Sequence, residues 1–291
     1  MLKQVPKRKA QLDFSRKMSL FWRATIASAR TKTILYMRFL SLTGLGLSFL
    51  PPLLNLGTAW VLYNVVYHQS TSTNFVSATN SSDYFSFVVV GSAFFVYVVA
   101  TMFTLGRTMF WDRASGTLEA VMLTPASTLA YMTGSMISAF GTATLNLVIM
   151  VVLGTLLGFH LGSLNMSIFA VGLVFMIISL FGLGLIVNAV TLYFRDRTNT
   201  ANTLTTLILV FSGIVAPLPL LPFWAQIIGS TIPFTYALNL LRLSLIATTS
   251  TVGSIDLVLL IISSLAYLIA GYFLLHATVR TIRKRALYAL F

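Results

Sequence analysis

The chain has 291 residues, of which 57% are hydrophobic and 9% are charged. Soluble domains carry about 25% charged residues, so this composition excludes a soluble protein and indicates an integral membrane protein. The sequence contains no cysteine, which excludes disulfide bonds, thiolate metal sites and a cysteine nucleophile. The net charge of +13 does not indicate nucleic-acid binding, because no basic patch with interleaved aromatic residues lies on a soluble element.

Residues 1–38 form a basic segment that precedes the first long apolar run. Over residues 14–33, apolar side chains recur at three- and four-residue spacing, whereas Arg16, Arg23 and Arg30 share the opposite face. This pattern predicts an amphipathic helix that lies in the membrane interface, with its basic residues toward anionic headgroups. The alternative is a solvated helix that packs on the rest of the protein.

The region over residues 39–279 consists of long apolar runs without period-two alternation. Such runs favour transmembrane helices over a β-barrel and predict an all-α membrane protein. Six transmembrane spans are expected, at residues 39–67, 84–106, 125–158, 167–192, 200–216 and 255–279. A basic tail over residues 280–291 follows the last span.

Residues 217–250 are apolar but rich in proline, with Pro217, Pro219, Pro222 and Pro233 close together. A straight transmembrane helix does not accommodate this many prolines. The segment therefore predicts a re-entrant or interfacial helical hairpin before the last span. It also holds Arg242.

Lysine and arginine are distributed unevenly between the two sides of the predicted topology. Of the 19 Lys and Arg residues, all except Arg242 fall in the N-terminal segment, the 107–113 loop, the 195–197 loop or the tail. Cytoplasmic loops carry the excess of Lys and Arg in membrane proteins. Both termini are therefore expected in the cytoplasm, and the 217–250 hairpin is expected on the outer side.

The loop over residues 107–127 is charged and lies between two apolar runs. Gly116 is expected to be the N-cap of a short helix, with Glu119 three residues further on at the positive end of the helix dipole. Thr124 and Pro125 then fit the N-cap and the first position of the next helix. The sequence thus predicts a short helix outside the membrane, followed by re-entry.

Groups for catalysis or ATP binding are missing from the sequence. No P-loop motif occurs, so the chain has no phosphate cradle of that type. His68, His160 and His276 are isolated, which favours interfacial positions over metal ligation. The span interiors contain no Asp, Glu, Lys or Arg, whereas ion-coupled transporters keep such groups at mid-membrane. We therefore expect neither an enzyme nor a resident metal ion.

Some aromatic and polar residues in the spans are candidates for lining a translocation path. Phe94, Phe95 and Tyr97 lie in the second predicted span. In the fifth, Asn202, Thr203 and Thr206 follow one helix face. The alternative for each residue is helix–helix packing, which such side chains commonly support in membranes.

Two motifs resemble those of ABC type-2 transporter permeases, a family of exporters of drugs, lipids and polysaccharides. The first is Asp-Arg-Ala-Ser-Gly-Thr-Leu-Glu-Ala-Val-Met-Leu-Thr-Pro-Ala-Ser, which begins at Asp112. Asp112 departs from the family pattern, in which Glu is frequent, but keeps the charge. The second motif comprises Phe211-Ser212-Gly213, Pro217, Leu221-Pro222, Pro233-Phe234-Thr235-Tyr236-Ala237 and Arg242.

The resemblance implies a half-transporter in which two permeases pair and two separate ATPase subunits bind beneath them. ATP and Mg would then be bound by the partner ATPase, and this chain would bind no cofactor. The amphipathic N-terminal helix would be a connecting helix, and residues 116–123 a coupling helix that docks on the ATPase. Spans two and five would line the path in the dimer, and the outer hairpin would cap it.

Named residues follow from this resemblance. The residues implied in coupling to the ATPase are Arg113, Gly116, Thr117, Leu118, Glu119, Thr124 and Pro125. The residues of the outer hairpin are Pro222, Pro233 and Arg242.

The substrate is expected to be an amphipathic drug or a lipid-like molecule, because the predicted path carries no formal charge and has aromatic residues. Export of a polysaccharide or a lipid-linked glycan is the alternative within the family. Outside the family, an ion-coupled secondary transporter and a membrane scaffold stay open. The expected location is the plasma membrane.

Overall fold

The computed structural model describes residues 18–34, 54, 56–61, 63–64, 73–79, 83–124, 127–159, 162, 164–194, 199–246 and 254–289. All regular elements in these ranges are helices, which confirms an all-α protein. Within them, four helices are long and apolar enough to cross a membrane: Tyr84–Ala114, Thr128–Leu156, Met166–Phe194 and Ile255–Ile282.

These four helices correspond to the second, third, fourth and sixth predicted spans. The first comprises α4 (Tyr84–Ala100), a π-turn (Thr101–Leu105) and α5 (Thr108–Ala114). The others are α7 (Thr128–Leu156), α8 (Met166–Phe194) and α12 (Ser254–Ala289). Two of them extend beyond the predicted ends at residues 106 and 279, because an apolar run marks where a helix leaves the membrane rather than where it ends.

The remaining two predicted spans differ in how far the structure describes them. Most of residues 39–67 lie outside the described residues, as do residues 1–17. The fifth span contains α9 (Asn199–Phe211), which has 13 residues. At 1.5 Å per residue this helix is about 20 Å long, shorter than the roughly 30 Å hydrocarbon core. It ends before the predicted residue 216 because Gly213, at a φ of 77°, turns the chain toward Pro217.

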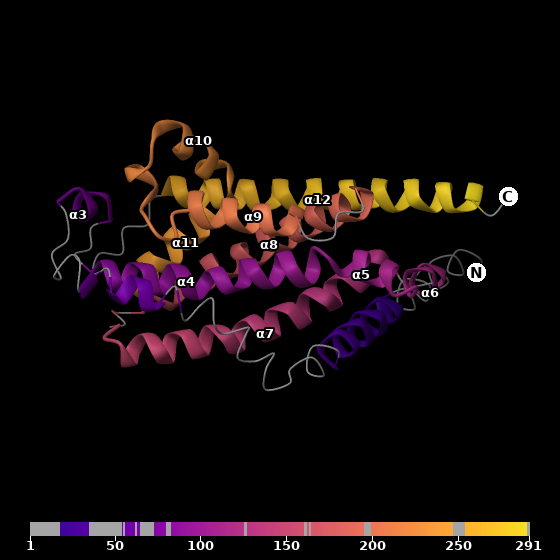
Figure 1. The fold of residues 1–291 in the computed structure, drawn as a ribbon, viewed down its shortest axis with the longest axis horizontal. Helices are drawn as coiled ribbons and strands as arrows, with labels where there is room; N and C mark the ends of the chain where they lie inside the picture. Colours follow the sequence, from indigo (N-terminus) through magenta and orange to yellow (C-terminus); the bar gives the residue numbers. More distant parts are fainter. Residues whose placement is uncertain are drawn as a thin grey trace, which may run out of the picture.

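The helix α8 is central to the bundle and packs against α12 and α11 (Pro233–Leu245), while α4 packs against α7 (Figure 1). Two glycines bring α8 and α12 into direct backbone contact. A Cβ atom on Gly182 would lie 2.5 Å from the backbone nitrogen of Leu268, and one on Gly271 would collide with the carbonyl oxygen of Gly182. Small residues permit such close approach of membrane helices.

The proline-rich segment after α9 forms short helices at the end of the bundle remote from α5 and α6 (Leu118–Leu123) (Figure 1). A 3₁₀ turn (Leu218–Leu220) precedes α10 (Phe223–Thr231), and α11 begins directly after Ile232. The short helix α3 (Thr73–Thr79) lies at this same end. Pro222 is the N-cap residue of α10, and Pro233 is the first residue of α11. The prolines thus stand at helix starts, where no backbone N–H is needed.

The helix over residues 18–34, hereafter the 18–34 helix, packs on α7. Its contact face is formed by small side chains, with Thr25 and Ser28 buried. The apolar side chains of Met18, Trp22 and Ile26 lie on another face and are exposed. The helix therefore packs on the rest of the protein and also presents exposed apolar side chains; its position in the membrane interface stays a prediction.

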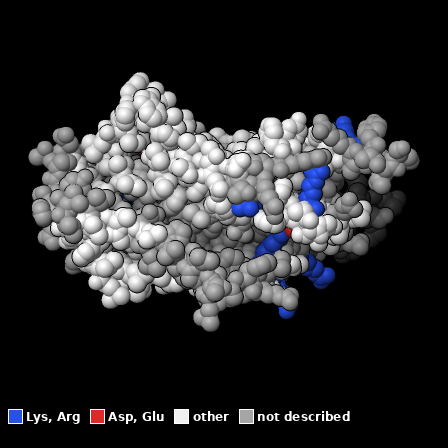
Figure 2. All heavy atoms as spheres, viewed as in Figure 1, with Lys and Arg blue, Asp and Glu red and all other residues white. Residues whose placement is uncertain are grey.

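Charged side chains concentrate at one end of the molecule. In Figure 2, the Lys and Arg residues that are visible lie between the middle of the molecule and the end that holds the 18–34 helix, α5 and α6. The opposite end, with α3 and α10, shows no blue surface among its described residues in this view. This separation follows the uneven distribution of Lys and Arg in the sequence.

Candidate functional site

The segment between α5 and α7 protrudes from the charged end of the bundle (Figure 1). Because α5 continues the helix that begins at Tyr84, the segment is attached to a membrane-spanning helix without an intervening flexible loop. After α5 the chain turns at Gly116 and forms α6. The sequence predicts a short helix at this place, outside the apolar runs, and α6 is that helix.

Gly116 ends α5 and does not cap α6, so the predicted N-cap is wrong. Its φ is 70°, in the left-handed region that favours glycine. The Gly116 N–H donates to the Arg113 carbonyl at 3.1 Å, and the Thr117 N–H donates to the Asp112 carbonyl at 2.8 Å. These two bonds form a Schellman motif, the common C-terminal cap of a helix. The N-cap position of α6 is Thr117, which makes no side-chain capping bond.

The start of α7 also differs from the prediction. Its N-cap is Ser127, whose hydroxyl accepts a hydrogen bond from the Ala130 N–H at 3.2 Å. Thr124, the expected cap, instead follows α6 and donates to the Val121 carbonyl at 2.7 Å. Pro125 lies outside the described residues. A hydroxyl at an N-cap satisfies a free N–H of the first turn, and both residues are suited to it, but Ser127 takes this role.

Asp112 is the centre of a polar junction between three helices. The residue is buried, with only 7% of its surface exposed. The Lys32 ammonium of the 18–34 helix donates to Oδ1 at 2.8 Å, and the Tyr131 hydroxyl of α7 donates to Oδ2 at 2.5 Å. Charge-assisted hydrogen bonds of this kind are the strong ones in proteins. One buried carboxylate thus joins the 18–34 helix, α5 and α7.

Further hydrogen bonds hold the 18–34 helix along α7. Thr25 donates to the Ala130 carbonyl at 3.2 Å, and Ser28 donates to the Tyr131 carbonyl at 2.9 Å. Gly134 makes this contact possible, because a Cβ atom there would collide with the carbonyl oxygen of Thr25. The 18–34 helix is therefore docked by backbone-to-side-chain contacts as well as by the ion pair.

The predicted coupling residues form an exposed turn with one buried anchor. Arg113, Gly116 and Thr117 are exposed, whereas Leu118 is 5% exposed and packs with apolar side chains of α7, α8 and α12. Leu123, at the end of α6, is 86% exposed. The side chain of Glu119 lies outside the described residues. The turn thus offers a cationic and an apolar side chain outward while Leu118 fixes it to the bundle.

The structure separates the candidate path residues into two groups. Phe94, Phe95 and Tyr97 are buried within the chain, and the Tyr97 hydroxyl lies 2.8 Å from the Thr144 hydroxyl of α7. The polar residues of α9 are on the surface: Asn202, Thr203 and Thr206. The aromatic group therefore packs α4 within one chain, and the polar group faces outward from it.

Arg242 is a buried cation that ties α11 to two other parts of the bundle. Its guanidinium donates to the carbonyl oxygens of Gly213 at 2.7 Å, Ile214 at 2.9 Å and Phe87 at 3.1 Å. It also lies 3.4 Å from the centre of the Phe87 ring. A buried charge needs such partners to offset its desolvation. Arg242 thus links α11 to the turn after α9 and to the start of α4.

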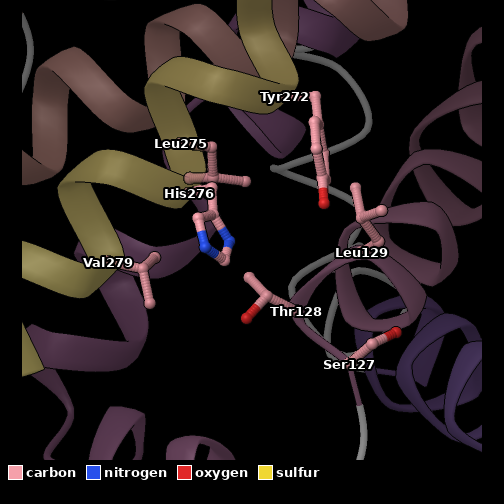
Figure 3. Close-up of a pocket in the computed structure, with 7 residues that line it drawn as sticks. All are labelled: Ser127, Thr128, Leu129, Tyr272, Leu275, His276 and Val279. Carbon is pink, nitrogen blue, oxygen red and sulfur yellow. The ribbon is translucent and has the colours of Figure 1, made fainter.

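A cavity of about 290 Å³ lies between the start of α7 and the half of α12 nearer its C-terminal end. Figure 3 shows the His276 ring directed toward Thr128, with Tyr272 above it. The rings of Tyr272 and His276 stack at 6.1 Å. Within the described ranges, no group of three His, Cys, Asp or Glu side chains is placed to bind a metal ion.

A family match relates the chain to known proteins. The sequence model of the family described as ABC-2 type transporter matches residues 17–246. This match covers the 18–34 helix, the segment around α6 and the hairpin of α10 and α11. No curated protein matches the chain.

Proposed function

Because the chain belongs to the ABC-2 type transporter family and is thus a membrane permease subunit, we propose that it is one half of an ATP-driven exporter. It would pair with a second permease and take its energy from separate ATP-binding subunits. ATP and Mg would be bound by those subunits. The expected setting is the plasma membrane, with the charged end of the molecule in the cytoplasm.

The observation that carries this proposal is the junction at Asp112. A coupling element needs an exposed surface for the ATPase and a stiff attachment to the spans. The turn over residues 113–123 supplies the surface, and the continuous helix from Tyr84 supplies the attachment. The Lys32–Asp112–Tyr131 contacts add the 18–34 helix and α7 to the same unit. A displacement of α6 by the ATPase would therefore move α5, α7 and the 18–34 helix together.

The exposed polar residues of α9 support pairing of two permeases. Asn202, Thr203 and Thr206 lie on the surface of a single chain. Polar side chains that face lipid are costly, and in membrane proteins they usually face another helix or a water-filled cavity. A second permease against this face would cover them or enclose a path between them. The pairing partner is either another copy of this chain or a related permease.

The exported substrate is proposed to be an amphipathic drug or lipid-like molecule. The α9 face combines these hydroxyl and amide groups with exposed apolar side chains, Leu207 and Val210 among them. Such a surface contacts both ends of an amphipathic molecule. Aromatic and hydroxyl surfaces also suit sugars, so a lipid-linked glycan is the second candidate.

Six transmembrane spans stay part of this proposal. The first span would lie within residues 39–67. The fifth would combine α9 with the turn at Gly213, and α10 with α11 would form a re-entrant hairpin on the outer side. The basic residues at the opposite end of the bundle support this orientation.

The test is purification of the tagged chain from its native membrane in mild detergent, followed by mass spectrometry. We expect a stoichiometric ATP-binding subunit, which is lost when Arg113→Glu and Leu123→Asp are combined. The matched control is Arg280→Glu, an exposed charge reversal on α12, which should retain the subunit. Purification of the wild-type chain without any ATP-binding subunit would contradict the proposal and favour a secondary transporter or a scaffold.

A further inference from the structure

The helix over Tyr84–Ala114 is interrupted by a π-turn at residues 101–105. The Gly106 N–H donates to the Thr101 carbonyl at 2.8 Å, a bond that spans five residues rather than four. A π-turn accommodates one extra residue and disturbs the regular hydrogen-bond ladder, and such turns occur frequently at functional sites. Here the turn separates α4, which lies in the membrane bundle, from α5, which leads to α6.

Two side chains of α8 bind the backbone at this interruption. Asn188 donates through Nδ2 to the Leu105 carbonyl at 2.7 Å, and Thr191 donates to the Gly106 carbonyl at 2.9 Å. Both residues are buried, at 0% and 1% exposure. Asn188 and Thr191 lie one turn apart on α8, and they bind two successive carbonyl groups of the helix over Tyr84–Ala114.

Asn188 is an unexpected residue for this position in an apolar span. A buried amide costs free energy unless its hydrogen bonds are made. Within the described part of the chain, Asn188 Oδ1 has no hydrogen-bond partner, so only one half of the amide is satisfied. Packing alone would be served by an apolar side chain. The residue is therefore best explained by what its Nδ2 group holds.

The contact between the π-turn and α8 is also close. A Cβ atom on Gly184 would lie 2.5 Å from Leu105 Cδ2 and 2.8 Å from Thr101 Cγ2. On the other side, a Cβ atom on Gly106 would lie 2.7 Å from Val187 Cγ1. The absence of side chains at both glycines lets the widened turn rest directly on α8.

The parts on either side of the turn are each held firmly. Before the turn, Tyr97 of α4 packs against the Phe140 ring of α7, with 5.2 Å between the ring centres. After the turn, Asp112 of α5 is joined to Lys32 and Tyr131. A change of angle between the coupling segment and the membrane part of this helix is therefore most easily made at the turn between them.

We propose that the π-turn is the pivot between the coupling segment and the bundle, and that Asn188 and Thr191 are positioning residues that set its angle. This inference rests on the proposed function, because a pivot is useful only if α6 is pushed by an ATPase. In the pivot, α8 serves as the support against which α5 turns. Loss of the two donors would leave the helix intact but would no longer fix the angle of α5.

The experiment measures the angle in the assembled complex with its ATPase, in lipid nanodiscs. The chain has no cysteine, so Ala114→Cys on α5 and the exposed Val174→Cys on α8, the helix against which α5 turns, introduce two sites for spin labels. We expect the distance between the labels to shift when a non-hydrolysable ATP analogue is added. In Asn188→Leu combined with Thr191→Val, the shift should fall to less than half of the wild-type value.

Two control variants separate positioning from simple destabilisation. Ser179→Ala changes another buried residue of α8, whose hydroxyl donates only within its own helix, to Met176. Thr191→Ser keeps the hydroxyl donor. Both should show the full shift. An unchanged shift in the double variant, or no shift in the wild-type complex, would overturn the pivot. Failure to isolate any ATPase complex would instead contradict the proposed function.

Discussion

Lys32 and Asp112 form a buried ion pair with 2.8 Å between Nζ and Oδ1, although 80 residues separate them in the sequence. The two side chains are 15% and 10% exposed. The pair connects the 18–34 helix to the segment that precedes α6. It is therefore a direct link between the 18–34 helix and α5, the helix that leads to α6.

The first prediction concerns this pair. In Lys32→Met, the Asp112 carboxylate keeps the Tyr131 hydroxyl but loses its cation. Removing one member of a buried pair costs about 3 kcal/mol or more, because the other charge stays buried. We expect a loss of about that size in the free energy of unfolding, measured by denaturant titration in mixed micelles. Release of the 18–34 helix should also expose it to proteolysis.

A double variant tests whether the cost comes from the stranded charge. Lys32→Met combined with Asp112→Leu removes both charges, so it should recover part of the loss seen in Lys32→Met alone. If Lys32→Met is as stable as the wild type, the pair does not hold the junction. If the loss in the double variant equals the sum of the losses measured for Lys32→Met alone and Asp112→Leu alone, the two side chains do not interact.

The second prediction concerns Gly116. In Gly116→Ala, a Cβ atom meets no other atom within 4 Å, so the only penalty is the backbone conformation at a φ of 70°. A left-handed conformation costs about 1 kcal/mol or more for a residue other than glycine. We expect a loss of that size in unfolding free energy, and a smaller loss for Gly116→Asn, because Asn tolerates this conformation better. Equal stability of the alanine variant would contradict the Schellman cap.

The third prediction concerns the glycine beneath the 18–34 helix. Gly134→Ala should force this helix away from α7, because the added methyl group meets the backbone of Thr25 and Ala29. Gly141→Ala is the matched control on the same helix, since nothing lies within 4 Å of its Cβ position.

The measurement is maleimide labelling of Ser28→Cys, whose side chain is buried in the docked helix. Labelling should become several-fold faster in Gly134→Ala and should stay unchanged in Gly141→Ala. Slow labelling in both variants would show that the helix tolerates the methyl group.

The fourth prediction concerns Arg242. Arg242→Met removes the guanidinium donor from the carbonyl oxygens of Gly213, Ile214 and Phe87. A buried carbonyl group that is left without a donor costs about 1–3 kcal/mol. Gly91→Ala should act on the same contact, because its Cβ atom would lie 2.5 Å from Nη2 of Arg242 and 2.6 Å from the Ile214 carbonyl oxygen. Both variants should lower the free energy of unfolding and loosen α11, which proteolysis near residues 212–217 reports. If the segment over residues 212–217 stays resistant to proteolysis in both variants, Arg242 does not hold α11 in place.

The sequence predicted the long helices well because burial in a membrane requires continuous apolar runs, and such runs are local. It predicted their ends less well. α5 contains Arg113 and Asp112, so hydropathy does not distinguish it from a loop. With α5 unrecognised, Gly116 fits an N-cap as well as a C-terminal cap, and only the structure decides between them.

The candidate site was predicted in part. The segment around α6 is recognisable because its motif is contiguous. Asp112 stands inside that motif, but nothing local identifies Lys32 or Tyr131 as its partners. Asn188 offered a signal that could have been used, since it is a lone amide within an apolar run. The π-turn that it binds has no comparable sequence signature, because one extra residue in a helix leaves the apolar pattern unchanged.

The backbone contact of α8 and α12 at Gly182 and Gly271 has a mechanical consequence. No side chain separates the two helices there, so neither can roll or slide without steric collision. We expect α8 and α12 to move together as one rigid body during transport. Changes in helix position would then occur mainly in the other helices of the bundle, relative to this pair.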